Sequence, residues 1–296
     1  MPTSWLYGNR TLEILRAAEE GRYGVTAAIV YNIEHLIAFI GAAETKKAPF
    51  IILFFPWAVT FSDGLLIRCA ADAARRASVP ISVHLDHAQD ENQIKYIADH
   101  REDLPFDSIM IDMSHYEKVE NLAKTKELVQ YLHERGIATE AEPGRIEGGE
   151  DGVGDTALND LKGMETTAAE AEEFINTGVD MLAPAFGNIH GDYPPAGPQL
   201  DFDRLAEIRR VCRQRDVRLV LHGTNGFEDD LMQRCIHGGM TKLNVNQLVL
   251  EDYLGHLGTS AGKLPLTEFM EQGVDRVRRR VEWLIDVSGS AGKGSY

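Results

Sequence analysis

The chain has 296 residues, of which 44% are hydrophobic and 26% charged, as is ordinary for a soluble globular protein with one large domain or two smaller ones. Its formal net charge of −16 leaves no broad basic surface, so we expect no binding to nucleic acid. The longest apolar run, Phe50–Phe61, contains Pro56 and is shorter than the roughly 20 residues of a membrane-spanning helix, so it is expected to be a buried strand with its loop.

The N-terminus and the cysteines bear on where the protein resides. The first residues lack the basic start and the apolar stretch of a signal peptide. The three cysteines, Cys69, Cys212 and Cys235, have no zinc-finger spacing, and a low, odd number of cysteines is typical of a reducing compartment. We therefore expect a cytoplasmic protein that does not contact a membrane.

Short apolar runs alternate with helical periodicity along the whole chain. Near-continuous apolar runs are typical of parallel strands that are buried on both faces. The predicted strands are Val25–Val30, Phe50–Phe55, Ile81–Leu85, Ser108–Met113, Ile137–Ala141, Asp180–Ala185, Leu219–Leu221 and Thr241–Val245.

A helical pattern follows each predicted strand, and one more helix is expected at each end of the chain. Eight strand–helix units in about 250 residues are typical of a TIM (β/α)8 barrel. The alternative, a doubly wound open sheet, is weakened because no G-x-G-x-x-G follows the first strand. The predicted helices are Arg10–Glu20, Ile33–Thr45, Gly64–Ala77, Glu91–Asp99, Val119–Arg135, Thr167–Asn176, Arg204–Arg215, Glu228–His237, Gln247–His256 and Leu266–Asp286.

We therefore expect a single α/β domain, a TIM (β/α)8 barrel that covers residues 1–296. It would carry an N-terminal helix over about residues 8–21 and a C-terminal helix over about residues 265–287. The tail Ser288–Tyr296 is rich in Gly and Ser and is expected to be frayed.

Three of the ten histidines lie where a predicted strand ends: His87, His190 and His222. They follow the third, sixth and seventh strands, and the C-terminal ends of barrel strands meet at one face. A single histidine at such a place is more often a core or loop residue. Three at the same end of three strands favour a metal, because three neutral imidazoles and an open position form a catalytic zinc site. His84 is either a packed core residue or a partner of this group.

A carboxylate directly precedes the first of these histidines. Adjacent strand residues point to opposite sides, so Asp86 and His87 reach the same site only if the strand ends there. Asp86 is then a candidate acid or base beside the metal.

Other carboxylates lie near the same face. Asp112 ends the fourth strand, and Glu142, just after the fifth, is a candidate to bind or assist the metal or to pair with Arg145. Glu150 lies in the long Gly-rich loop 143–161, where a mobile carboxylate can cover a site or simply face the solvent.

The loops after the seventh and eighth strands are candidates for phosphate binding. They offer backbone amides and short polar side chains at a helix start, where the helix dipole favours anions. The same residue types are also ordinary turn residues, so the signal is weak by itself. The residues concerned are Gly223, Thr224, Asn225 and Gly226 after the seventh strand, and Asn244, Val245, Asn246 and Gln247 at the end of the eighth.

Together these segments resemble the class II, metal-dependent fructose-bisphosphate aldolase family. The matching segments follow the family order over about residues 25–250. They read VHLDHA, SIMIDMSHYEKVENLAKTKELV, ATEAEPGRIEGGEDGV, VDMLAPAFGNIHGDYP, LDFDRL, LVLHGTNG and TKLNVN.

The resemblance implies roles for these residues. Asp86 corresponds to the catalytic aspartate that handles the proton on the hydroxyl next to the cleaved bond. Glu142 corresponds to a glutamate that binds the metal in an alternative position, Asp112 to a nearby acidic residue, and Glu150 to the loop glutamate that moves the C–H proton of dihydroxyacetone phosphate. The zinc ligands correspond to His87, His190 and His222. The phosphate-binding set corresponds to Gly191, Gly223, Asn225, Asn244, Asn246 and Gln247, and a sodium or potassium ion is expected beside it.

By the same resemblance, the protein is a lyase that cleaves a ketose 1,6-bisphosphate, with fructose 1,6-bisphosphate as the first expectation. The products would be dihydroxyacetone phosphate and glyceraldehyde 3-phosphate, formed through a zinc-stabilised enediolate in a homodimer or homotetramer. This chemistry needs no Schiff-base lysine, so Lys242 is expected to be structural.

The sequence also departs from the family pattern. HGTNG stands where the family reads HGGSG or HGASG, and Asn244–Gln247 replaces Asn-x-Asp-Thr. Ile29 and Phe55 fall near positions that hold a substrate-contacting asparagine and a serine in the family. These changes favour retained aldol chemistry on a changed substrate. The alternatives are tagatose bisphosphate or another phosphorylated ketose, an isomerase or epimerase, and a catalytically silent metal-binding barrel.

Overall fold

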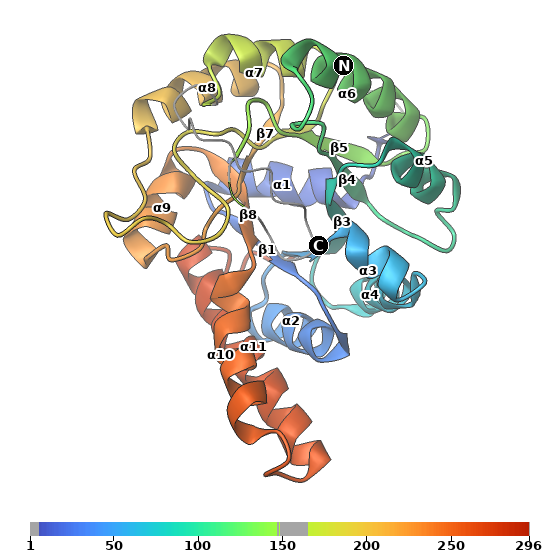
Figure 1. Cartoon of the computed structure of the whole chain (residues 1–296), viewed down its shortest axis with the longest axis vertical. Helices are drawn as coiled ribbons and strands as arrows, with labels where there is room; N and C mark the ends of the chain where they lie inside the picture. The colour runs from blue at the N-terminus through green and yellow to red at the C-terminus, as the bar shows by residue number, and fades with distance from the viewer. Residues whose placement is uncertain (1–5, 147, 149–164, 296) are drawn as a thin grey trace.

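The computed structural model describes residues 6–146, 148 and 165–295 of the chain. Eight parallel strands form a closed barrel in the order β1 to β8, with β8 paired to β1 (Figure 1). The predicted TIM barrel is therefore confirmed. The open doubly wound sheet is excluded, because a closed barrel has no edge strand.

All eight predicted strands are present. Two differ most from their expected bounds, since β3 continues three residues further and β6 is only two residues long. The strands are β1 Val25–Ile29, β2 Phe50–Phe54, β3 Ile81–Ala88, β4 Ser108–Ile111, β5 Ala138–Ala141, β6 Met181–Leu182, β7 Arg218–Leu221 and β8 Met240–Val245.

The ten predicted helices are also present, and helices surround the barrel (Figure 1). They are α1 Arg10–Gly21, α2 Ile33–Lys46, α4 Leu65–Arg76, α5 Glu91–Asp99, α6 Lys118–His133, α7 Ala168–Ile175, α8 Phe202–Gln214, α9 Asp229–His237, α10 Gln247–Ser260 and α11 Leu266–Ser288.

One short helix, α3 Pro56–Phe61, lies where the sequence predicts a loop. Proline at its first position has its φ angle already set for a helix and lacks only an N–H that would be unpaired there. Its second residue, Trp57, is exposed. None of the helices in the described part of the chain is long and apolar enough to cross a membrane.

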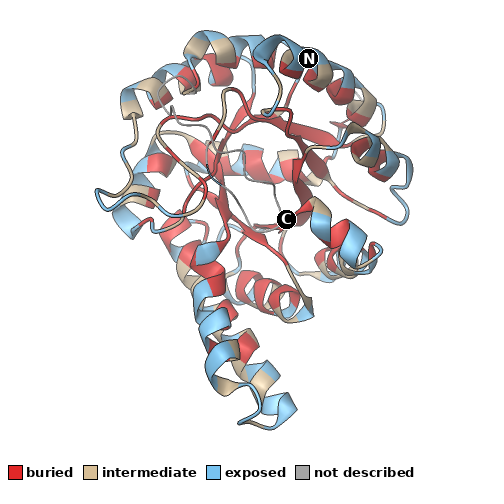
Figure 2. Cartoon of the chain, in the orientation of Figure 1, coloured by how far each residue is buried: buried red, intermediate tan, exposed pale blue. Residues whose placement is uncertain are grey.

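Buried side chains form two layers, because successive strand residues point to opposite faces of the sheet. The barrel interior holds Ala27, Ile29 and Leu53, together with α1 residues that cover its N-terminal end. The layer between strands and outer helices holds Phe50 and Phe54 with the apolar faces of the helices. Figure 2 shows the strands buried at the centre and the helices exposed on their outer sides.

The C-terminal tail differs from the frayed end that the sequence suggests. The backbone N–H of Gly292 donates to the carbonyl oxygen of Lys46 at 2.9 Å, and that of Gly294 donates to the carbonyl oxygen of Lys47 at 2.6 Å. Ser290 is fully buried. The expectation was wrong for these residues because the carbonyl groups at the end of α2 accept hydrogen bonds from the tail.

Candidate metal centre

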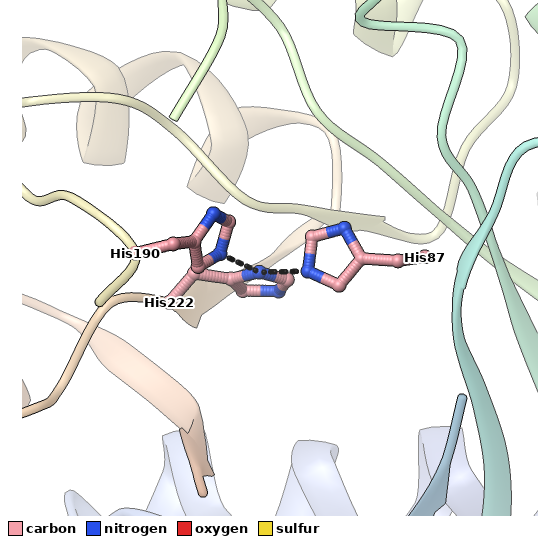
Figure 3. A group of neighbouring side chains, drawn as sticks. All are labelled: His87, His190 and His222. Carbon is pink, nitrogen blue, oxygen red and sulfur yellow. Dashed lines mark hydrogen bonds between the residues drawn. The ribbon is translucent and has the colours of Figure 1, made fainter. Parts of the chain in front are cut away.

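The three predicted histidines meet at the C-terminal end of the barrel. His87 belongs to β3, His190 to the loop after β6, and His222 directly follows β7. Nε2 of His87 lies 3.1 Å from Nδ1 of His222, and Nε2 of His190 lies 3.4 Å from the same Nδ1 (Figure 3). All three side chains are buried, and all three line the same pocket as Asp86.

A bulge in β3 lets two neighbouring residues face this pocket. The pairing of β3 with β4 shifts register between Leu85 and Ala88, and His87 has a φ angle of 50°. The sequence suggests that Asp86 and His87 can share a site only where the strand ends. The strand instead continues to Ala88, and the left-handed conformation of His87 reverses the usual alternation. Such a conformation in a non-glycine residue is costly and is often found at functional sites.

Carboxylates fix which nitrogen of two rings faces the centre. Nδ1 of His87 lies 3.0 Å from Oδ2 of Asp112, and Nε2 of His222 lies 2.9 Å from Oε1 of Glu140. A carboxylate accepts a hydrogen bond, so these two ring nitrogens carry the protons in the neutral tautomers. The other ring nitrogens, Nε2 of His87 and Nδ1 of His222, then present lone pairs to each other at 3.1 Å. A cation bound between them would stabilise this arrangement.

The spacing of the three nitrogens fits a small divalent ion. Zn–N bonds of about 2.0–2.1 Å in tetrahedral geometry place the nitrogens about 3.3 Å apart. The two measured separations, 3.1 and 3.4 Å, lie on either side of that value. A carboxylate behind the ligating imidazole is typical of metal-binding histidines. His87, His190 and His222 can therefore hold a metal.

The charges around the centre favour a cation as well. Burial raises the pKa of Asp86, but His87 and Lys242 outweigh it and hold that pKa well below its ordinary value. Burial also opposes ionisation of Glu140, yet Lys242 and His222 lower its pKa to about 2. The pKa of Asp112 is lowered despite burial, mainly by His87. Three ionised carboxylates thus surround Lys242 and the histidines, so the centre is suited to hold positive charge.

A buried polar network lies beneath the histidines. Nζ of Lys242 is 2.7 Å from Oε2 of Glu140, and both side chains are fully buried. His84 is hydrogen-bonded to Ser108 through Nδ1, and its Nε2 lies 3.6 Å from both Asp86 and Glu140. His84 is therefore a partner of this network rather than a residue of the apolar core. The position of Lys242 is consistent with the structural role expected for it.

Asn244 contributes to the pocket in a way that the sequence does not indicate. Its Nδ2 lies 3.1 and 3.0 Å from the two oxygens of Asp86, so it donates to the carboxylate and holds it in place. Gly223, Asn225, Asn246 and Gln247, which the family resemblance assigns to phosphate, also line the pocket. Gly191, which follows His190 with a φ angle of 78°, is not among the lining residues.

The remaining carboxylates have distinct surroundings. Asp112 accepts hydrogen bonds from His87, Gln89 and Ser114, so it lies behind His87 rather than among the converging nitrogens.

Oε1 of Glu142 accepts from the backbone N–H of Ile146 at 2.7 Å, and its Oε2 has no hydrogen-bond partner among the described residues. The Glu142 carboxylate is thus held by the backbone at Ile146. Burial, and then Asp112, raise the pKa of Glu142 to about 8. Glu150 lies outside the described residues.

Sequence reasoning overlooked Glu140. It shares a strand face with Glu142, but the sequence pattern singles out only Glu142, which is nearer the barrel mouth. The signal was a carboxylate in the middle of a buried strand, because such a charge needs a partner there.

Comparisons with known proteins identify the family of the chain. The family model described as "Fructose-bisphosphate aldolase class-II" matches residues 9–293. The fructose-bisphosphate aldolase of Streptococcus pneumoniae serotype 4 is 33% identical over 298 residues, which cover 95% of this chain and 97% of that protein.

Solved structures described as aldolases have the same fold as this chain. A Coccidioides immitis protein of known crystal structure is 49% identical, with a TM-score of 0.93 over 98% of this chain and 99% of that one. The YdjI aldolase of Escherichia coli K12 is 29% identical, with a TM-score of 0.83 over 96% of this chain and 98% of that one. The match to the family model extends over nearly the whole chain, and the chain belongs to the class II fructose-bisphosphate aldolase family of lyases.

Proposed function

We propose that the protein is a zinc-dependent aldolase that cleaves a phosphorylated ketose, with fructose 1,6-bisphosphate as the first substrate to test. The products would be dihydroxyacetone phosphate and glyceraldehyde 3-phosphate. The observation that supports this most is the shared pocket of Asp86 with three histidine nitrogens spaced for one divalent ion. We further propose a cytoplasmic homodimer or homotetramer, and three free cysteines agree with a reducing compartment.

His87, His190 and His222 would hold the ion. When bound, zinc supplies a Lewis acid for the ketone oxygen and the neighbouring hydroxyl oxygen of the substrate. The protein's own part begins with Asp112 and Glu140, which hold two imidazoles in the tautomer that presents a lone pair.

Asp86 would move the proton that accompanies cleavage. It is buried, its pKa is held low by His87 and Lys242 against the effect of burial, and Asn244 fixes both its oxygens. An ionised carboxylate in that position accepts the proton of the hydroxyl at the cleaved bond, and returns it in the condensation direction. Glu150 is proposed, from the family resemblance alone, to exchange the C–H proton of dihydroxyacetone phosphate.

The loops after β7 and β8 would bind the phosphate of the dihydroxyacetone fragment. Gly223, Asn225 and Asn246 offer backbone amides beside the start of α10. The monovalent cation expected with this set is part of the same proposal. Glu142, whose carboxyl is buried near the histidines, is proposed as an alternative metal ligand.

Replacing Asp86 with Ala tests the proposal. Cleavage of fructose 1,6-bisphosphate should fall by about 10²–10⁴-fold, the usual contribution of a general acid or base. Zinc content should stay near that of the unchanged protein if zinc is held by His87, His190 and His222, a group that does not include Asp86. Asp203→Ala, an exposed change on α8, is the matched control. Unchanged turnover in Asp86→Ala would refute the role of this residue.

The same assay separates the alternative functions. Tagatose 1,6-bisphosphate is run beside fructose 1,6-bisphosphate at defined zinc concentrations. Faster cleavage of the tagatose epimer would change the proposed substrate to tagatose 1,6-bisphosphate and leave the proposed aldolase chemistry unchanged. Zinc binding without triose products from either ketose would indicate a silent barrel, and isomerised sugar without trioses would indicate an isomerase.

A further inference from the structure

Two apolar side chains occupy the arc of the barrel mouth between β8 and β3. Ala28 pairs with Val245, so the next residue, Ile29, lies beside Asn246. Phe54 pairs with Leu85, so the next residue, Phe55, lies beside Asp86. Around the rim, Ile29 and Phe55 therefore stand between the loop after β8 and the carboxylate that handles the proton.

Both side chains face the pocket rather than the outer helices. Ile29 and Phe55 belong to the cluster of side chains inside the barrel, and they line the pocket together with Asp86 and the three histidines. Only 4% of Ile29 and 2% of Phe55 is exposed. The Phe55 ring lies 6.2 Å from the His87 ring, so it borders the metal centre directly.

Aromatic rings support this apolar wall from behind. The Tyr31 ring lies 6.4 Å from Phe55 and 6.2 Å from Trp57, and Trp57 stacks on Phe61 at 4.5 Å. The Tyr31 hydroxyl donates to Oδ1 of Asn246 at 3.1 Å and so points toward the loop after β8. The side chains of Ile29 and Phe55 offer no hydrogen-bonding group to a ligand in the pocket.

We infer that Ile29 and Phe55 receive the aldehyde and set its specificity. The enzyme then favours aldehydes whose carbon next to the carbonyl carries hydrogen or an alkyl group over aldehydes that carry a hydroxyl there. The inference rests on the proposed aldolase function. It follows because an aldehyde whose oxygen is held at Asp86 lies next to Phe55, which is beside Asp86 across β2 and β3 and lines the same pocket.

The chemistry of this step is the condensation direction of the proposed reaction. A base takes a C–H proton from dihydroxyacetone phosphate, and the carbon left behind forms a bond to the aldehyde carbon as the C=O π bond of the aldehyde opens. The aldehyde oxygen then takes a proton from Asp86 in its protonated form. Proton exchange with water returns the base and Asp86 to their starting states, so the proton lost from carbon is balanced by the one gained by oxygen. A hydroxyl that packs against Phe55 would gain no hydrogen bond from that side chain in exchange for the one it loses to water, which is unfavourable. An apolar pocket rejects an added hydroxyl only moderately, by up to roughly 10²-fold.

The test measures condensation of dihydroxyacetone phosphate with matched aldehydes by the zinc-loaded protein. Acetaldehyde is compared with glycolaldehyde, and 3-phosphooxypropanal with glyceraldehyde 3-phosphate, since each pair differs only by the hydroxyl. The kcat/KM ratio of the first member to the second should exceed about 10 in the unchanged protein.

Two substitutions identify the side chain responsible. Phe55→Ser places a hydroxyl at the wall and should lower the ratio at least about tenfold. Phe55→Leu keeps the wall apolar and should leave the ratio within about threefold of the original. Ile29→Asn gives a second polar variant if Phe55→Ser folds poorly, and thermal unfolding with bound zinc establishes that each variant is folded.

The outcomes separate the inference from the proposed function. A ratio below one in the unchanged protein overturns the inference, as does a ratio that neither Phe55→Ser nor Ile29→Asn alters in folded, zinc-loaded form. Absence of any condensation product with all four aldehydes overturns the proposed function instead.

Discussion

Nε2 of His222 lies 2.9 Å from Oε1 of Glu140, whose other oxygen lies 2.7 Å from Nζ of Lys242. All three side chains are buried. The carboxylate thus connects a ring at the barrel mouth to a lysine in the barrel interior. It orients the His222 ring and keeps its proton on Nε2, so that Nδ1 faces His87 and His190.

Glu140→Gln should weaken zinc binding by about 10–100-fold, the usual effect of removing a partner behind a ligating histidine. The amide keeps the size of the side chain but no longer holds the His222 proton by charge. Competition with a chelator of known affinity measures the change. Glu120→Gln, an exposed change on α6, serves as the control. Equal zinc affinity in both variants would mean that Glu140 does not support the metal.

Removal of the metal should abolish cleavage and lower stability together. A ligand present at about 1,000 times its dissociation constant stabilises the folded state by about 4 kcal/mol. Chelator-treated protein should therefore unfold at a lower temperature, and added zinc should restore both activity and the unfolding temperature.

Borohydride in the presence of substrate should not inactivate the enzyme, because no lysine Schiff base is required. Inactivation by borohydride would give Lys242 a catalytic role.

The barrel and its elements follow from patterns that are local in the sequence. Apolar runs such as Phe50–Phe54 and Val25–Ile29 are buried on both faces, and their alternation with helical patterns indicates a parallel barrel. The helix that begins at Pro56 was missed because its residues continue the apolar run of β2. The tail attachment was missed because it depends on backbone hydrogen bonds of Gly292 and Gly294, which no side-chain pattern reveals.

The candidate site was predictable only in part. The three histidines could be found because each follows a strand and all such strands end at one face. The bulge that turns His87 toward the pocket depends on the pairing of β3 with β4. Because β4 is a separate segment later in the chain, the residues around His87 do not by themselves reveal the bulge. Asn244 was expected to contact phosphate but holds Asp86, since the direction of a side chain at a strand end is set by its neighbours in the barrel.

The buried His35 should make stability depend on pH. Burial lowers its pKa from 6.5 to about 4, so the unfolded chain binds more protons than the folded one between these values. Stability is then complete above pH 6.5 and falls as the pH falls toward 4, by about 2 kcal/mol between pH 7.5 and 5. Urea unfolding of the unchanged protein and of His35→Gln at both pH values measures this contribution.

The difference in unfolding free energy between the unchanged protein and His35→Gln cancels the contribution of all other titrating groups. Between pH 7.5 and 5, the free energy of unfolding of His35→Gln should fall by about 2 kcal/mol less than that of the unchanged protein. His100→Gln, an exposed change at the end of α5, should behave as the unchanged protein. Parallel pH dependence in all three proteins would contradict the burial of a neutral His35.

Two glycines after β7 allow a matched test of how the metal-site loops are held together. Gly223 and Gly226 have nearly the same φ angle, 67° and 68°. A Cβ at Gly223 would lie 2.3 Å from the carbonyl oxygen of Ile189, whereas a Cβ at Gly226 would meet nothing within 4 Å. Only Gly223 is therefore required for the close approach of the loop that carries His190.

Gly226→Ala should cost about 1 kcal/mol of stability from its left-handed conformation and leave zinc affinity unchanged. Gly223→Ala carries the same strain and also pushes Ile189 away, so its neighbour His190 moves relative to His222. Zinc affinity should fall at least about tenfold, because three nitrogens must keep their spacing to share one ion. Denaturant unfolding and chelator competition measure the two effects separately. Equal zinc affinity in the two variants would show that the contact between Gly223 and Ile189 does not hold the metal site in place.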